Sequence, residues 1–254
     1  YKLPKQGRAI DVELMVYWNE KAKMLKLAVP VAFRDPRYVG QVAYGRDEFP
    51  RDGREVVTQQ WNGVVSDRDG LALTCLNDGI YGSDMTGEEW RLTLLRSPGY
   101  SALPGGKLKN TMPQDRYSDR IDQGERRYRF RFEGGAAAER LEAVDREALA
   151  FNEKPYALTY FPPGTGKAAQ PLARLTDNAV LMTAFKRAER DADAYIVRLF
   201  EPTGQARRTV LELPLLGIRY DAALQPFEIK TLKVVPAART IEECPLMEMD
   251  VQTN

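Results

Sequence analysis

The chain of 254 residues contains no histidine, and this absence removes several classes of active site. A catalytic triad built on histidine, a zinc site with histidine ligands and a histidine general base cannot be assembled from this chain by itself. Cysteine is also scarce, because Cys75 and Cys244 are far apart and no CxxC pair exists, so we expect no zinc–thiolate site. Cys75 lies within an apolar strand pattern, which predicts a free buried thiol; a disulfide is the alternative.

An excess of charge of either sign is missing as well. Lys plus Arg number 37 against 36 Asp plus Glu, and the net charge of +1 gives no electrostatic reason to expect nucleic acid or an anionic membrane as a partner. No apolar run approaches the ~20 residues of a membrane helix, and the N-terminus "YKLPKQGRAI" has no apolar signal core. We therefore expect a soluble, cytoplasmic protein. The first residue is not Met, so we expect a fragment or a trimmed product.

Hydrophobic residues make up 43% of the chain, and their dominant pattern has a period of two. In "RRYRFRFE" (126–133) the residues Tyr128, Phe130 and Phe132 share one face, and arginines occupy the other. The same alternation occurs in "DVELMVYW", "MLKLAVPV", "WRLTLLRS", "DAYIVRLFEP", "RTVLELP" and "FEIKTLKV". This pattern is typical of half-buried antiparallel strands, so it predicts an all-β fold. The side chains predicted to be largely buried are Trp18, Leu27, Trp61, Leu73, Leu92, Tyr128, Phe130, Phe132, Val197 and Phe227.

Two stretches depart from the alternation. Leu141, Val144 and Ala148 recur at helical spacing after a Gly-Gly break, which predicts a short helix over 136–143 that connects two β units. The predicted units are 1–143 and 144–254, and the second includes the connector. Residues 98–124 form a long loop rich in Pro and Gly; loops of this length are usually functional or disordered, so we expect this one to be less ordered than the sheets.

Polar side chains gather at two strand ends. Asn77, Asp78, Tyr81 and Asp84 follow a buried strand, and an Asp/Arg-rich segment precedes another. Carboxylates, amides, guanidinium and phenol groups match the vicinal hydroxyls of a sugar. The plainer interpretation is a capped turn and a set of solvated ion pairs. The candidate substrate-proximal residues are Asn77, Asp78, Tyr81, Asp119, Arg120, Asp122, Gln123 and Glu125. There is no GxSxG motif, and "GTGK" (164–167) lacks the full phosphate-loop spacing.

Several motifs in a fixed order resemble those of one known family. The first is the string formed by Trp61, Ser66, Gly70, Ala72, Leu73, Leu76, Asn77, Asp78, Tyr81 and Gly82. The others are "FRDPRYVGQVAYG", "WRLTLLRSPGY", "DQGERRYRFRF", "REALAFNEKP", "RLFEPTG" and "FEIKTLKV". Together they resemble the C-terminal β region of glycoside hydrolase family 38 α-mannosidases, in the bacterial and cytosolic–vacuolar branch. Close relatives often carry "DQGEHRF", so Arg126 stands where those proteins have histidine.

The resemblance implies a large supersandwich of the galactose-mutarotase type followed by a smaller C-terminal β-sandwich. It also implies that the family's zinc, nucleophilic Asp and acid Asp lie in an N-terminal catalytic domain outside this chain. On this view the chain has no catalytic residue, metal or cofactor of its own. Its loops complete the cleft of a retaining α-mannosidase and brace the catalytic domain, which is its partner together with the α-mannoside substrate.

Two other functions remain open from the sequence: a separate sugar-binding module, and a scaffold or oligomerisation domain with solvated loops. The linkage preference, the oligomeric state (a homo-oligomer included) and the residues that touch sugar are not encoded in any recognisable pattern.

Overall fold

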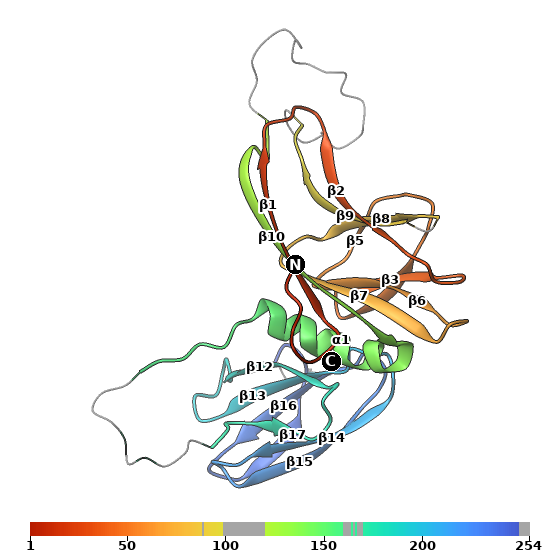
Figure 1. The fold of residues 1–254 in the computed structure, drawn as a ribbon. Coiled ribbons are helices and arrows are strands. Elements are labelled where there is room, and N and C mark those ends of the chain that lie inside the picture. Colours follow the sequence, from red (N-terminus) through yellow and green to blue (C-terminus); the bar gives the residue numbers. More distant parts are fainter. Residues whose placement is uncertain (88, 99–119, 160–163, 165, 167–169, 249–254) are drawn as a thin grey trace, which may run out of the picture. The chain divides into compact units, whose positions relative to one another are not determined.

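The computed structural model describes residues 1–87, 89–98, 120–159, 164, 166 and 170–248. They form two compact units: Tyr1–Gly40 with Asp47–Arg140, and Gln41–Arg46 with Leu141–Asn254. All the sheets in both units are antiparallel, which confirms the predicted all-β class (Figure 1). The units divide after Arg140, three residues before the boundary predicted at 143. The assignment of the hairpin residues Gln41–Arg46 to the second unit has no counterpart in the sequence pattern.

The first unit is a sandwich of two sheets. Its six-stranded sheet has the order β1-β10-β7-β6-β3-β4, with the bounds Ile10–Trp18, Gly124–Ala136, Leu71–Asn77, Trp61–Ser66, Arg37–Val42 and Gly45–Phe49. Its four-stranded sheet has the order β2-β9-β8-β5, with the bounds Met24–Pro30, Glu89–Arg96, Gly82–Thr86 and Val56–Val57. β1 pairs with β10 in register over its whole length, from Ile10 opposite Phe132 to Trp18 opposite Gly124.

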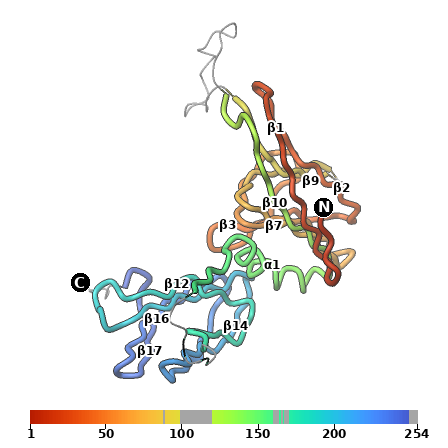
Figure 2. The backbone as a smooth tube through the Cα atoms, turned by 60° about the vertical axis from the view of Figure 1, so that its left-hand side comes forward, coloured from red at the N-terminus to blue at the C-terminus, as the bar shows by residue number. Residues whose placement is uncertain are grey.

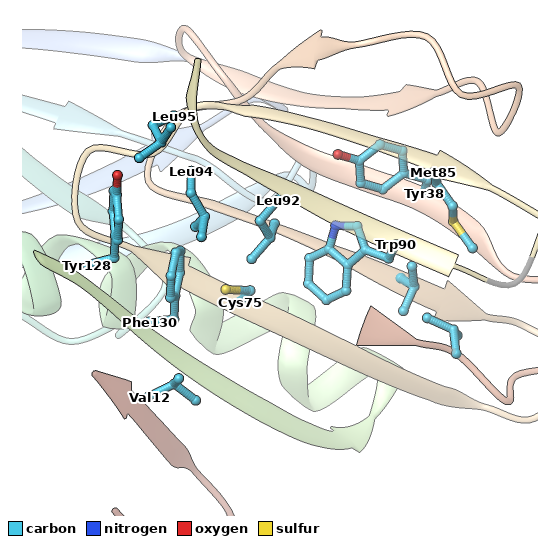
Figure 3. Close-up of a cluster of buried hydrophobic side chains, with 12 residues drawn as sticks. Val12, Tyr38, Cys75, Met85, Trp90, Leu92, Leu94, Leu95, Tyr128 and Phe130 are labelled. Atoms are coloured by element: carbon cyan, nitrogen blue, oxygen red, sulfur yellow. The ribbon is translucent and has the colours of Figure 1, made fainter. Parts of the chain in front are cut away.

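The core of this sandwich lies between the two sheets. Figure 3 shows Cys75, Leu92 and Phe130 together in it, and each is at most 1% exposed. Trp61 and Tyr128 are also buried, whereas Trp18, Leu27, Leu73 and Phe132 are partly buried and pack against the cluster. Phe130 and Phe132 are thus placed as the alternation predicts, and both cysteines are free thiols.

The second unit is a smaller sandwich. Its three-stranded sheet β11-β14-β15 comprises Arg174–Leu175, Arg207–Leu213 and Ile218–Leu224. Its four-stranded sheet β12-β13-β16-β17 comprises Leu181–Arg187, Tyr195–Phe200, Ile229–Val235 and Thr240–Glu243. Val197, Leu199, Leu211 and Leu232 are completely buried between these sheets, so the predicted burial of Val197 is confirmed.

Three details of the sequence prediction are wrong. The helix α1 spans Ala137–Asn152 rather than 136–143, and β10 runs through the supposed Gly-Gly break until Ala136. Phe227 is 41% exposed because it lies in a turn before β16, with a φ of +58° that takes it out of the strand alternation.

Candidate functional site

The first polar group predicted from the sequence lies on the turn that follows β7. The side chain of Asn77 stabilises this turn. The Asn77 side chain is buried; its Nδ2 donates to the backbone oxygen of Gln59 at 2.8 Å, and its Oδ1 accepts from the backbone N–H of Ile80 at 2.9 Å. The chain then turns through Gly79 at a φ of +86°, a conformation that glycine adopts without steric cost. Asn77 therefore fixes the backbone of the turn at Ile80 and ties the turn to the segment before β6.

Asp78 and Tyr81 face solvent from this turn. The Asp78 carboxylate pairs with Arg129 of β10, with 2.8 Å between Oδ2 and Nε, and about half of the Asp78 side chain stays accessible. Tyr81 is 49% exposed. A carboxylate, a guanidinium and a phenol are all groups that can form hydrogen bonds with sugar hydroxyls.

The second polar group lies at the start of β10 and is held by backbone contacts. Gln123 Nε2 donates to the backbone oxygen of Glu20 at 2.9 Å, which ties the segment to the turn after β1. Asp122 adopts a positive φ of +54°, its Oδ2 accepts from the backbone N–H of Arg96 at 3.4 Å, and its Oδ1 lies 3.9 Å from Nη2 of Arg126. Burial raises the pKa of the nearby Tyr128 phenol, and the negative charge of Asp122 raises it further.

The two polar groups lie at different points along β10. Asn77 stands opposite Phe130, whereas Glu125 lies five residues earlier on the same strand, about 16 Å away at the usual rise per residue. Glu125 pairs with Arg127 at 2.9 Å. Arg120 is half-buried, and Asp119 lies outside the described residues. Within the part of the chain described here, the candidates form two separate surface groups rather than one cluster.

Asp84, which belongs to the same polar stretch as Asn77, has a structural environment. Its side chain is fully buried, and it pairs with Lys26 of β2 and with Nε of Arg91 on β9 at 2.7 Å. Asp84 therefore joins three strands of the four-stranded sheet. Asp84 lies in β8, which begins at Gly82, and this strand separates it from the turn residues.

The sequence analysis missed a buried carboxylate in the second unit. The side chain of Glu201 is fully buried and accepts hydrogen bonds from the backbone N–H groups of Thr203, Gly204 and Phe227, at 2.8 Å, 2.8 Å and 3.1 Å. Arg207 Nε approaches Glu201 Oε1 to 3.2 Å. Burial acts to raise the pKa of Glu201, but the hydrogen bonds from Thr203, Phe227 and Gly204 outweigh it and hold the pKa below its usual value. The "EPTG" turn was the only signal, and by itself it indicates no more than a turn.

The resemblance places the family's zinc site outside this chain, so the only question here is whether the chain has a metal site of its own. Across the described ranges, no group of three or more His, Cys, Asp or Glu side chains is placed to hold a metal ion. The whole chain has no histidine. None of the helices in those ranges is both long and apolar enough to cross a membrane.

Comparison with known proteins agrees with the motif pattern. Residues 1–110 match the sequence model described as the glycosyl hydrolases family 38 C-terminal domain. A relative from Dictyostelium discoideum, called Alpha-mannosidase G, is 23% identical over 263 residues, which cover 89% of this chain and 22% of the relative. The resemblance to the C-terminal region of these proteins is thereby confirmed.

Solved structures share the fold. A crystal structure of an alpha-mannosidase from Enterococcus faecalis V583 matches with a TM-score of 0.72 and 19% identity over 91% of this chain and 28% of that chain. A protein in the glycosyl hydrolase family 38 from the same species matches with a TM-score of 0.71 and 20% identity, over 91% and 29% of the two chains. This chain thus spans less than a third of the length of each of these relatives.

Proposed function

We propose that this chain, which resembles the C-terminal β region of glycoside hydrolase family 38, is the non-catalytic C-terminal part of a retaining, zinc-dependent α-mannosidase. One observation carries the proposal: the family model matches residues 1–110. The relative that matches over 89% of the chain is called an alpha-mannosidase, which supports it. That relative is several times longer than the region matched, so it has room for a catalytic domain elsewhere.

The proposed division of labour follows from the chemistry of the reaction. Retaining hydrolysis uses a nucleophilic and an acid carboxylate about 5 Å apart across the scissile bond. The resemblance assigns both carboxylates, and a zinc ion that binds sugar hydroxyls, to the N-terminal domain. This chain contributes a rigid β scaffold, and its exposed polar groups complete the cleft for terminal α-mannosides or brace the catalytic domain.

The surface chemistry of the first unit supports this role. Asp78 and Tyr81 project from a turn whose backbone Asn77 fixes, so their positions are set before any substrate arrives. The segment from Arg120 to Glu125 offers a second polar surface, held by Gln123. Their separation along β10 suggests a division of tasks, with one group near the substrate and the other against the catalytic domain.

The alternative is a separate carbohydrate-binding or scaffold module without chemistry. The exposed side chains of Asp78 and Tyr81 suit sugar binding as well as cleft completion. The two functions differ in what the isolated chain does. A binding module takes up mannose alone, whereas a cleft-completing part acts only together with a catalytic domain.

The test is complementation. The residues that precede this chain in its gene are expressed as a separate catalytic part and assayed with an aryl α-mannoside, with and without the 254-residue chain added in trans. We expect turnover to rise when the chain is added, and calorimetry to detect no mannose binding by the chain alone. Full activity of the catalytic part without the chain would contradict the proposal, and mannose binding by the chain alone would favour the alternative.

A further inference from the structure

β1 is an edge strand with an unusual degree of exposure. It lies at the end of the six-stranded sheet and pairs along one side with β10; Figures 1 and 2 both show these two strands side by side. On its other side the described chain makes one bridge, between Lys2 and Asp11. Beyond Asp11, the remaining length of that edge has no partner strand among the described residues.

The Lys2–Asp11 bridge identifies which backbone N–H and C=O groups of β1 point away from β10. Lys2 N–H donates to Asp11 O at 2.8 Å, and Asp11 N–H donates to Lys2 O at 3.0 Å, so both backbone groups of Asp11 point away from β10. Because these directions alternate along a strand, the N–H and C=O groups of Glu13, Met15 and Tyr17 point the same way. None of these six groups has a hydrogen-bond partner among the described backbone groups.

The side chains on this part of β1 are also exposed. Met15 is 65% exposed and Tyr17 is 79% exposed, on the face of the sheet opposite the core. Proteins usually protect edge strands by shortness, a bulge or proline. β2 ends at Pro30 and pairs with β9 through a register shift at Leu94, and β12 carries a bulge at Thr183, whereas β1 has nine residues in unbroken register. An edge of this kind is a template for another strand.

We propose that the residues immediately preceding Tyr1 in the longer protein form a strand that pairs with β1 in antiparallel orientation. The inference rests on the proposed function, since it requires the chain to continue into the part that the relatives possess. The Lys2–Asp11 bridge fixes the register. The first, third and fifth residues before Tyr1 stand opposite Glu13, Met15 and Tyr17.

The covalent connection favours this occupant over a second copy of the chain. Tyr1 is one residue from a backbone that already pairs with β1, so a strand continuing from it is held at the edge at an effective concentration on the order of millimolar. A second copy would have to meet the same edge from solution and would compete with the tethered segment. The added strand joins the upstream part of the protein to the six-stranded sheet through main-chain hydrogen bonds.

Hydrogen exchange tests the pairing without any measurement of activity. The 254-residue chain is compared with a chain extended by roughly ten of its own upstream residues, a full strand length. We expect the amides of Glu13, Met15 and Tyr17 to exchange about tenfold or more slowly in the extended chain. The amides of Val12, Leu14 and Val16 face β10 and serve as the internal control, with protection in both forms. Equal exchange at Met15 in the two chains would overturn the proposal.

Disulfide trapping tests the register and the occupant. Met15→Cys is combined with a cysteine at the third residue before Tyr1, in a Cys244→Ser background. A hydrogen-bonded antiparallel pair has Cα atoms about 5.5 Å apart, within the range of a disulfide. We expect an intramolecular crosslink there and none from the second residue before Tyr1. An intermolecular crosslink, or protection that depends on protein concentration, would assign the edge to a second copy and overturn the proposal.

The two proposals fail separately. If the extended chain shows the strand but complementation shows no gain in turnover, the pairing stands and the role in the cleft does not. If complementation succeeds while Met15 exchanges equally in both chains, the function stands and the pairing does not.

Discussion

Phe130 is the residue through which β10 contributes most to the core of the first unit. It is 1% exposed, its ring centroid lies 6.3 Å from that of Phe132, and Figure 3 shows it beside Cys75. We expect Phe130→Ala to lower the free energy of unfolding by about 3–5 kcal/mol. All three tryptophans lie in the first unit, so urea unfolding followed by tryptophan fluorescence reports on it. Arg127→Ala, on the exposed face of the same strand, is the control; a loss below about 1 kcal/mol for Phe130→Ala would contradict the register.

Glu201 makes the second unit sensitive to acid. Its pKa is held below the usual value of 4.5 in the folded state, so its contribution is fully present above that value and is lost as the pH falls through the lowered folded-state pKa. We expect the unit to lose stability on acidification below about pH 4.5, and Glu201→Gln to flatten that dependence. Thermal unfolding followed by circular dichroism between pH 7 and pH 3 measures both. The control is Glu189→Gln, at an exposed carboxylate; an unchanged pH profile in Glu201→Gln would refute the assignment.

Among the elements, the strands were predictable and their ends were not. Tyr128, Phe130 and Phe132 alternate because one face of β10 packs on the core, and that constraint is visible in the sequence. The end of β10 depends on tertiary contact instead. Gly134 and Gly135 stay in the strand, opposite Leu73 and Ala72, and the absent Cβ of Gly135 leaves room for the Arg140 side chain.

The candidate site was predictable in composition but not in arrangement. The polar residues around Asn77 and Gln123 could be identified from their places at strand ends. Their separation could not, because it depends on Asn77 pairing with Phe130 rather than with a residue near Gly124. Such a register is decided by distant strands and leaves no local signal.

The length of α1 yields a prediction about the stability of the second unit. The helix continues to Asn152 because Leu149 and Ala150 extend a favourable run, and it ends shortly before Pro155, a residue that cannot continue a helix. Ala150 is exposed, so Ala150→Gly removes helix propensity without disturbing the core. We expect a loss of about 0.5–1 kcal/mol in urea unfolding of the second unit, followed by circular dichroism. Ala192→Gly, in an exposed turn, should cost almost nothing; equal effects at the two positions would mean that the helix does not extend past 143.

For the whole molecule, the absence of histidine and the proposed division of labour give a prediction about activity. We expect no turnover of aryl α-mannosides by these 254 residues, with or without added zinc, because the proposal places both reacting carboxylates and the metal elsewhere. The measurement is a chromogenic assay of the purified chain, with the full-length protein as the positive control. Zinc-dependent hydrolysis by the isolated chain would show that the chemistry does not belong to a separate domain.

In the full-length protein, substitutions can decide whether the exposed polar groups take part in hydrolysis or only form a solvated surface. Asp78 and Arg129 form a solvent-exposed pair, and such pairs contribute about 0–1 kcal/mol to stability. Asp78→Ala and Arg120→Ala should therefore lower the rate of α-mannoside hydrolysis by more than any loss of folding stability explains. Asp67→Ala is the matched control. Asp67 lies in the turn between β6 and β7 and forms an exposed pair with Arg37 of β3 at the same 2.8 Å separation. If Asp78→Ala and Arg120→Ala leave the rate as unchanged as Asp67→Ala does, the two polar groups are structural surface and the cleft is completed by other residues.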